Sequence, residues 1–224
     1  MSFDFAAIYR SHRERFSALV LDLDAHALAT VVPATPLWTV QDAFAHVAGV
    51  AFDISVGRLD GVTSELWTQR QVDERRGRTP GEIEREWSDL GPTVEAILEA
   101  AGPAMSHMVM DVVMHHCDVT GALGIPAPRE DEGLRLCLRA ANAISAKIDA
   151  AGLPALRVET EGLDRVLGNG DASITVRGDS YEIARALFGR RSLAQIAMFD
   201  WTGDPTPYLP LFSVFTPRQT PLVE

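Results

Sequence analysis

The most informative segment of this 224-residue chain reads Ala104-Met-Ser-His107-Met-Val-Met-Asp111-Val-Val-Met-His115-His116-Cys-Asp118-Val-Thr-Gly-Ala-Leu123. At about 100° per residue, it has the apolar periodicity of an amphipathic helix. The centre of the apolar side contains Met105, Val109, Val112, His116 and Leu123. A polar seam runs along one flank and contains His107, Asp111, His115 and Asp118. The segment therefore predicts a helix that presents metal-ligating side chains beside an apolar core.

The spacing within this helix suits a divalent metal ion. Residues four apart on a helix lie one turn above each other, so Asp111 and His115 can bind one ion together. Sites in helical bundles take a further ligand from a facing helix. His46 is the natural candidate, because it lies at the edge of the apolar stripe of a helix predicted over residues 39–57.

Helical phase alone leaves two rivals for the site. His116 lies in the apolar centre, where it is either an alternative ligand or a core histidine with a satisfied hydrogen bond. His107 shares the polar seam, which either lines a cleft or is solvated. Spacing therefore indicates a metal site without choosing all its ligands.

The first two-thirds of the chain is rich in predicted helices. Apolar spacing, prolines and capping residues place them over residues 3–24, 39–57, 79–98, 104–123 and 130–151. Thr79-Pro80-Gly81-Glu82 has the N-cap, first-turn proline and N3 glutamate of a helix start. Residues 60–78 form a polar connection.

The pattern changes after Gly152-Leu153-Pro154. Residues 155–161 and 172–177 alternate apolar and polar side chains, as half-buried strands do, with a turn signal at Asn169-Gly170 between them. These two strands are expected to pair as neighbours. Short helices are predicted over 179–188 and 192–199, followed by an extended tail rich in proline. We therefore expect a helical bundle over residues 1–152 and a small α/β domain over 153–224, in a mainly α fold.

The composition excludes some partners. The formal net charge is −11, and the basic runs are short, at Arg75-Arg76-Gly77-Arg78 and Arg190-Arg191. Nucleic acid and anionic membranes both favour a basic face, so they are poor partners. The N-terminus lacks the pattern of a signal peptide, and no run of about 20 apolar residues occurs. A cytoplasmic protein, monomeric or homodimeric, is expected.

Nucleophilic catalysis by the chain itself is not indicated. The two cysteines, Cys117 and Cys137, fall inside helical patterns and look like buried thiols of a reducing compartment. Neither has a helix N-terminus near enough to lower its pKa. No G-x-S-x-G, P-loop, Rossmann glycine pattern or C-x-x-C appears.

Three further residues are candidates for supporting roles. Asp42 lies four residues before His46 and is expected to orient its imidazole. Arg190 and Arg191 form by default a solvated pair, and they bind a substrate carboxylate if the second domain faces the metal.

Several motifs resemble those of one family. Trp38-Thr-Val-Gln-Asp-Ala-Phe-Ala-His46-Val-Ala-Gly49 is similar to its "W-t-v-r-d-l-l-a-H-l-a-G" helix, and His115-His-Cys-Asp118-Val-Thr-Gly-Ala-Leu-Gly124 to its "H-x-W-D-l-x-x-A-l-G". Further counterparts are Gln71-Val-Asp-Glu-Arg-Arg-Gly-Arg-Thr79, Val176–Ser192 and Trp201-Thr-Gly-Asp204. Together they resemble the mycothiol-dependent maleylpyruvate isomerase-like group of the DinB/YfiT-type metalloenzymes, over nearly the whole chain.

The resemblance implies a DinB-like four-helix bundle followed by a sterol-carrier-like α/β domain. It also implies zinc, or alternatively nickel or iron, bound by His46, Asp111 and His115. Asp111 departs from the family's usual Glu, so either the helix lies closer or a water completes the coordination. Cys117 replaces the family's usual Trp. Asp118 matches a family Asp that orients a ligand or caps the helix.

The activity implied is that of a mycothiol-dependent isomerase or thiol transferase. The open metal position would bind the thiol of mycothiol and lower its pKa, which explains the absence of a catalytic cysteine. The thiolate would then attack a small electrophilic substrate that carries a carboxylate in the isomerase. Two alternatives remain: a non-enzymatic binding protein that keeps the fold, and a metal-dependent hydrolase in which bound water is activated.

Overall fold

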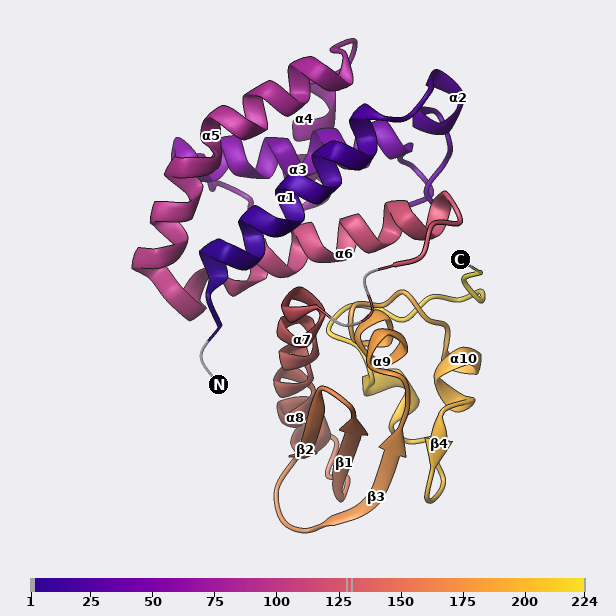
Figure 1. Cartoon of the computed structure of the whole chain (residues 1–224). Helices are drawn as coiled ribbons and strands as arrows, with labels where there is room; N and C mark the ends of the chain where they lie inside the picture. Colours follow the sequence, from indigo (N-terminus) through magenta and orange to yellow (C-terminus); the bar gives the residue numbers. More distant parts are fainter. Residues whose placement is uncertain (1–2, 128, 130, 224) are drawn as a thin grey trace. The chain divides into compact units, whose positions relative to one another are not determined.

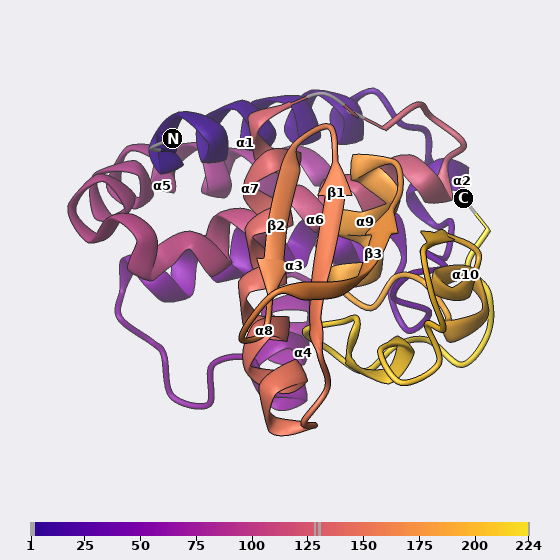
Figure 2. The same ribbon diagram turned by 90° about the horizontal axis from the view of Figure 1, so that it is seen from below.

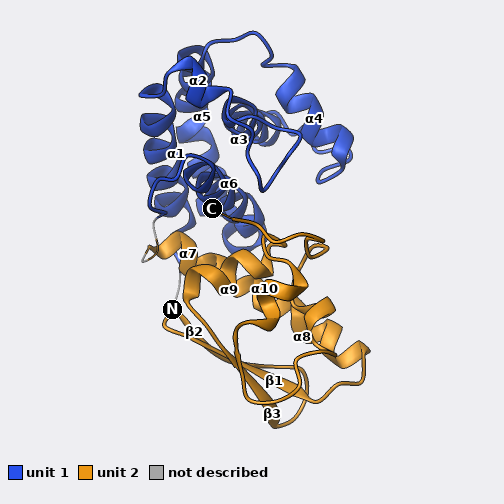
Figure 3. Ribbon diagram, turned by 90° about the vertical axis from the view of Figure 1, so that its right-hand side faces the viewer, with its two compact units in different colours: residues 1–127, 224 blue, residues 128–223 orange. Residues whose placement is uncertain are grey.

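The computed structural model describes residues 3–223 except 128 and 130. It is mainly helical with a small four-stranded sheet. The chain divides into two compact units, residues 1–127 and 128–223, coloured separately in Figure 3. Each unit is described by itself below.

The regular secondary-structure elements of unit 1 are all helices in the residues described (Figure 1). Its elements are α1 (Phe5–Leu21), α2 (Ala25–Leu28), α3 (Val40–Ser55), α4 (Glu65–Asp73), α5 (Pro80–Ala101), the 3₁₀ turn η1 (Gly102–Met105) and α6 (Ser106–Ala122). Four long helices, α1, α3, α5 and α6, pack against one another. The helices predicted in this half of the chain are confirmed, with ends shifted by a few residues.

Local sequence explains where two of these helices begin. Thr39 caps α3 and Thr79 caps α5, each with a reciprocal capping box to the third helical residue, Asp42 and Glu82. Each box satisfies backbone N–H groups that have no partner within the helix. The start of α3 in turn sets the rotation at which His46 faces the core.

The centre of unit 1 is an aromatic cluster. Phe16 of α1, Phe44 of α3 and Trp87 of α5 are fully buried, with ring centroids 5.4–6.1 Å apart. The indole Nε1–H of Trp87 donates a hydrogen bond of 2.7 Å to the hydroxyl of Tyr9. Phe16 also stacks on His116 of α6, so the cluster contacts both helices that carry the candidate metal ligands.

Helix α4 corrects the expected polar connection over residues 60–78. Only Trp67, Gln71 and Val72 of this helix are buried, so its apolar stripe is too weak to be recognised from the sequence. It packs against α3 at Gly49. A Cβ at Gly49 would lie 2.4 Å from the Cβ of Gln71, so glycine permits this close approach.

We therefore expect Gly49→Ala to destabilise unit 1 by about 1–3 kcal/mol, because α4 must move to relieve the overlap. In an unconstrained helix the same change would stabilise by about 1 kcal/mol. Urea unfolding followed by circular dichroism measures the difference.

Gly81→Ala is the matched control, because nothing lies within 4 Å of a Cβ at this helical position. It is expected to be neutral or to stabilise slightly. A Gly49→Ala protein as stable as Gly81→Ala would contradict the close packing of α3 and α4.

Unit 2 combines helices with the sheet. Its elements are α7 (Glu132–Cys137), η2 (Leu138–Ala140), α8 (Ala141–Ala150), β1 (Ala155–Thr160), β2 (Leu163–Leu167), β3 (Ala172–Arg177), α9 (Ser180–Leu187), α10 (Leu193–Ala197), β4 (Asp200–Trp201) and η3 (Leu209–Leu211). The strand order is β2-β1-β3-β4. Figure 2 shows β2, β1 and β3 side by side.

The two predicted strands are neighbours, and they pair in parallel. Two strands were missed. One is β2, which forms a hairpin with β1 and lies at the edge of the sheet, with Asp164, Arg165 and Val166 exposed. The other is the two-residue β4. Asn169-Gly170 lies between β2 and β3, which are not adjacent in the sheet.

The helix predicted over 130–151 is interrupted by the 3₁₀ turn η2, where the consecutive residues Leu136, Cys137 and Leu138 are all buried. The expected domain boundary lay at residue 152, whereas the compact units divide after Ala127. The physical reason is packing, because α7 contacts α9, and α8 contacts β1 and β2.

The tail after Gly203 is not simply extended, because it contains η3 and is bound to α10. The Gln195 side chain exchanges hydrogen bonds of 2.7 and 3.0 Å with the backbone of Leu222. Among the residues described, no helix has the length and hydropathy needed to cross a membrane.

Candidate functional site

Three predicted metal ligands meet on one side of unit 1. His46 comes from α3, and Asp111 and His115 come from adjacent turns of α6. One ligand atom from each lies within 4.8 Å of the others. His46 is 2% and His115 5% exposed, while the Asp111 side chain is 36% exposed. The group is therefore buried on the histidine side and open at the carboxylate.

The distances fit a small divalent cation. His46 Nε2 lies 3.4 Å from Asp111 Oδ2, and His115 Nε2 lies 3.5 Å from Asp111 Oδ1. Ligands about 2.1 Å from a tetrahedral ion lie roughly 3.4 Å apart. Asp111 Oδ2 is buried and completes no hydrogen bond of good geometry, so an acceptor is available at this point. The shorter aspartate thus reaches both imidazoles without the methylene of a glutamate.

Asp118 lies behind His115. Its Oδ2 is 3.2 Å from His115 Nδ1, and the residue is fully buried. A carboxylate at Nδ1 holds the proton there and leaves Nε2 directed toward Asp111. The contact lacks ideal hydrogen-bond geometry, so Nδ1 of His115 has no well-formed hydrogen bond. Asp118 therefore lies where its carboxylate can orient the imidazole of His115.

The three side chains perturb one another's acidity. Burial would raise the pKa of Asp111, but the charge of His115 and the close contacts of both imidazoles with the carboxylate hold that pKa well below its usual range. Burial would lower the pKa of His115, but Asp111 and Asp118 raise it to about 9. Burial lowers the pKa of His46, against opposing contacts with Asp111 and Gln71. The metal-free protein thus holds a proton on His115, which a bound cation would displace.

Trp38 packs against both imidazoles. Its ring centroid is 4.7 Å from that of His46 and 5.7 Å from that of His115. Its indole Nε1–H points to Gln69 Oε1 at 3.4 Å. Trp38 directly precedes Thr39, the N-cap of α3. Its position restricts the movement of both histidines.

The structure separates the two rival histidines from this group. His116 is buried, where its Nδ1 lies 3.2 Å from His12 Nδ1 and its ring stacks on Phe16 at 5.2 Å. His107 is exposed one turn before Asp111. Of the two interpretations of His116, the structure therefore favours a core histidine, with His12 of α1 as its polar partner.

Asp42 has a different position from the one expected. Its Oδ2 accepts hydrogen bonds of 2.9 and 2.8 Å from the backbone N–H and the hydroxyl of Thr39. As the third helical residue it belongs to the capping box, which directs its carboxylate back to the helix start. Its sequence spacing from His46 had suggested an orienting role instead.

The arginine pair also differs from expectation. Arg191 is 5% exposed, and its guanidinium forms two hydrogen bonds, of 2.6 and 3.0 Å, with the carboxylate of Glu182. Arg190 donates to the Phe188 carbonyl at 2.9 Å. The contact with Glu182 ties the segment after α9 to the first turn of that helix. Arg191 is therefore one half of a structural ion pair within unit 2 rather than a solvated cation.

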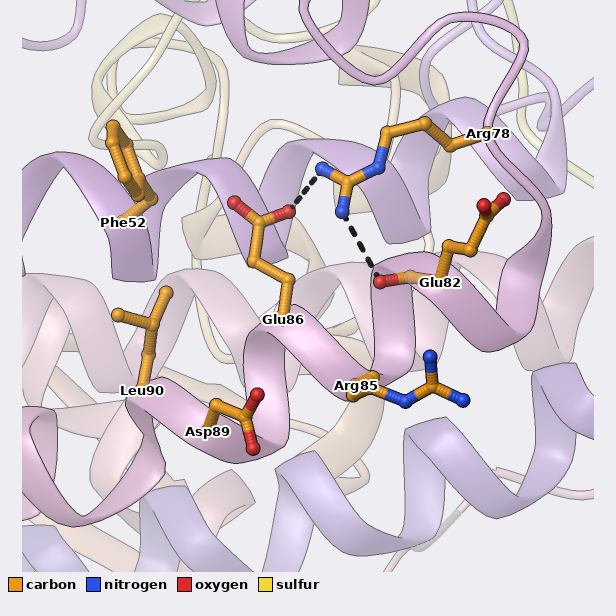
Figure 4. A pocket seen from close by; sticks show the side chains of 7 residues that line it. All are labelled: Phe52, Arg78, Glu82, Arg85, Glu86, Asp89 and Leu90. Carbon is orange, nitrogen blue, oxygen red and sulfur yellow. Dashed lines mark hydrogen bonds and ion pairs between the residues drawn. The ribbon is translucent and has the colours of Figure 1, made fainter.

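Two other features belong to the structure rather than to the site. The thiols of Cys117 and Cys137 are fully buried, as expected. A shallow pocket along α5, shown in Figure 4, is lined by Phe52, Arg78, Glu82, Arg85, Glu86, Asp89 and Leu90. Glu86 within it is held by Arg75 and Arg78 at 2.6 Å each. Glu86, Arg75 and Arg78 therefore form an ion-pair network at this pocket.

Sequence reasoning missed the position of Gln71. This residue of α4 is completely buried, and its amide nitrogen donates a 2.7 Å hydrogen bond to Asp53 of α3. The signal in the sequence was slight, because Gln71 lies in a polar stretch and was noted only within a motif of the resemblance. Its neighbours, His46 and Asp53, are remote in sequence.

Comparison with known proteins gives two structures of the same fold. A histidine-to-alanine variant of the mycothiol-dependent maleylpyruvate isomerase has a TM-score of 0.60 and 14% identity, covering 88% of this chain and 91% of that chain. A second structure of the mycothiol-dependent maleylpyruvate isomerase has a TM-score of 0.52 and 16% identity, covering 83% and 88%. No protein-family model and no curated protein matches the chain. The relationship is therefore a distant one of fold.

Proposed function

We propose that this protein is a metal-dependent enzyme that uses a low-molecular-weight thiol, mycothiol, to isomerise a small electrophilic substrate or to transfer the thiol to it. The observation that carries the proposal is the convergence of His46, Asp111 and His115 within 4.8 Å. The shared fold with two mycothiol-dependent isomerase structures supports it. The fold proposed is accordingly a DinB-like bundle followed by a sterol-carrier-like domain.

Each residue of the group has a definite task in this proposal. His46 and His115 supply neutral nitrogen ligands from two helices, and Asp111 supplies a carboxylate between them. Asp118 orients His115, and Trp38 covers both imidazoles on one side. The partial exposure of Asp111 leaves the approach for a thiol and a substrate.

The donor set specifies the class of metal. Two nitrogens and one carboxylate oxygen suit zinc, and also nickel or iron. A divalent ion held by three protein ligands keeps an open position, where it would lower the pKa of a bound thiol. The buried Cys117 and Cys137 are not needed as nucleophiles under this proposal.

The test combines metal analysis with a thiol-dependent assay. The purified full chain is expected to contain about one divalent ion per molecule, measured by elemental analysis. Maleylpyruvate is the first substrate to assay, by its change in ultraviolet absorbance with and without mycothiol. Turnover is expected only with both the metal and mycothiol present.

Three results would count against the proposal. Absence of stoichiometric metal under metal-replete conditions would leave a fold without this chemistry. Failure of mycothiol to react with maleylpyruvate or with a panel of electrophilic alkenes would point to a binding protein. Equal turnover without any thiol would indicate hydrolysis by activated water instead.

A further inference from the structure

Three residues on one face of α3 lie beside Gln71 of α4. His46, Gly49 and Asp53 are three and four residues apart, so they lie along one side of the helix. Gln71 of α4 crosses this side at Gly49, where the missing side chain admits its Cβ and Cγ. The amide of Gln71 therefore lies between Asp53 at one end and His46 at the other.

Hydrogen bonding fixes which way the amide points. Gln71 Nε2 lies 2.7 Å from Asp53 Oδ2, and Asp53 is also paired with Arg58 and Arg70. A carboxylate paired with cations accepts hydrogen bonds, so the amide NH₂ must face Asp53. The carbonyl Oε1 of Gln71 must then face away from Asp53.

Two buried polar atoms are left without a well-formed hydrogen bond at this place. One is Gln71 Oε1, an acceptor, and the other is His46 Nδ1. Gln71 is completely buried and His46 is 2% exposed, so water reaches neither readily. His46 Nε2 faces Asp111 in the candidate metal site, and when Nε2 binds a cation the neutral imidazole carries its proton on Nδ1. Gln71 also contacts His46, so a donor and an acceptor of matching chemistry face each other.

We infer that Gln71 is a positioning residue for the candidate metal centre, with its side-chain carbonyl accepting the Nδ1–H of His46 so that Nε2 is directed at Asp111 and His115. This inference rests on the proposed metal site. Asp53, Arg58 and Arg70 hold Gln71 in turn, so the orientation of His46 depends on α4. The role corresponds to the one that Asp118 has at His115.

The first test is zinc affinity of the full chain, measured by competition with a chromophoric chelator. Gln71→Leu keeps the side-chain volume but loses the carbonyl, and it is expected to weaken Zn²⁺ binding roughly 10–100-fold. Gln71→Glu keeps an acceptor for Nδ1–H but places a carboxylate against Asp53. It is expected to retain affinity better than Gln71→Leu while unfolding at lower urea concentration.

The second test reports on orientation without metal. Long-range ¹H–¹⁵N spectra of the metal-free protein identify which nitrogen of His46 carries the proton. In this state the Asp111 carboxylate competes for a proton on Nε2, so the wild type is expected to show a larger Nδ1–H population than Gln71→Leu, in which Nε2–H predominates. Gln41→Leu is the control, because it removes an amide that donates to the Arg78 carbonyl and should change neither affinity nor tautomer.

The outcomes separate this inference from the proposed function. If the wild type binds no zinc, the metal site is wrong, and the tautomer spectra still decide whether Gln71 orients His46. If the wild type binds zinc and Gln71→Leu matches it in affinity and tautomer, Gln71 has no positioning role. Equal losses in Gln71→Leu and Gln41→Leu would likewise overturn the inference.

Discussion

Replacing His115 by alanine is expected to abolish stoichiometric metal binding. The change removes the ligand whose imidazole contacts both Asp111 and Asp118, and it leaves His46 and Asp111 as two donors. Loss of a direct ligand should exceed the roughly 10–100-fold cost of losing an outer partner. His46→Ala should have the same effect from the other helix. Elemental analysis and zinc titration of the folded variants measure it.

Two histidines of the same helix α6 provide matched controls. His107→Ala changes an exposed side chain and should alter neither metal content nor stability. His116→Ala removes a ring stacked on Phe16 and close to His12, so it should lower stability and still retain the metal. If His116→Ala loses the metal while His115→Ala keeps it, the ligand assignment is wrong.

The sequence predicts some of the candidate ligands but not all of them. Spacing on one helix identified Asp111 and His115 as a pair, because i and i+4 side chains must lie on one face. It could not exclude His116, since adjacent residues differ by about 100° and the boundary between core and flank depends on how α6 is rotated against α1 and α3. Packing with Phe16 and His12 settles that rotation.

Residues from other elements were harder to place. Asp42 has the right spacing from His46, but the cap at Thr39 takes its carboxylate. Gln71 has no local signal, because its position depends on the contact between α4 and Gly49. The sequence predicted a solvated Arg191, but the chain folds back so that Arg191 is buried against Glu182. In each case a tertiary contact or a cap overrides the pattern.

The fold follows the same division between local and tertiary information. Long helices with capping signals, such as α3 and α5, were predicted correctly, because their caps and apolar stripes are local. Strand β2 was missed, because an edge strand with three exposed central residues lacks regular alternation. The parallel pairing of β1 with β3 requires the chain between β2 and β3 to pass the start of β1, which no local pattern encodes.

Trp87→Ala is expected to lower the free energy of unfolding of unit 1 by about 3–5 kcal/mol, the usual range for emptying a buried aromatic site. Trp87 is fully buried, and its ring contacts those of Tyr9, Phe16 and Phe44. Domains are typically stable by only about 5–15 kcal/mol, so this loss would remove a large fraction of the stability of unit 1. Urea unfolding monitored by far-ultraviolet circular dichroism measures the loss.

Trp87→Phe separates the contribution of aromatic packing from that of the indole hydrogen bond to Tyr9. It keeps an aromatic ring but removes the Nε1–H that donates to Tyr9, which leaves a buried hydroxyl without that donor. The expected cost is about 1–3 kcal/mol. Leu66→Ala, at an 86% exposed position of α4, should change stability by less than about 0.5 kcal/mol. If Trp87→Ala were no more costly than Leu66→Ala, the aromatic cluster would not be the core of unit 1, and the spacing of α3 and α6 at the metal ligands would need another explanation.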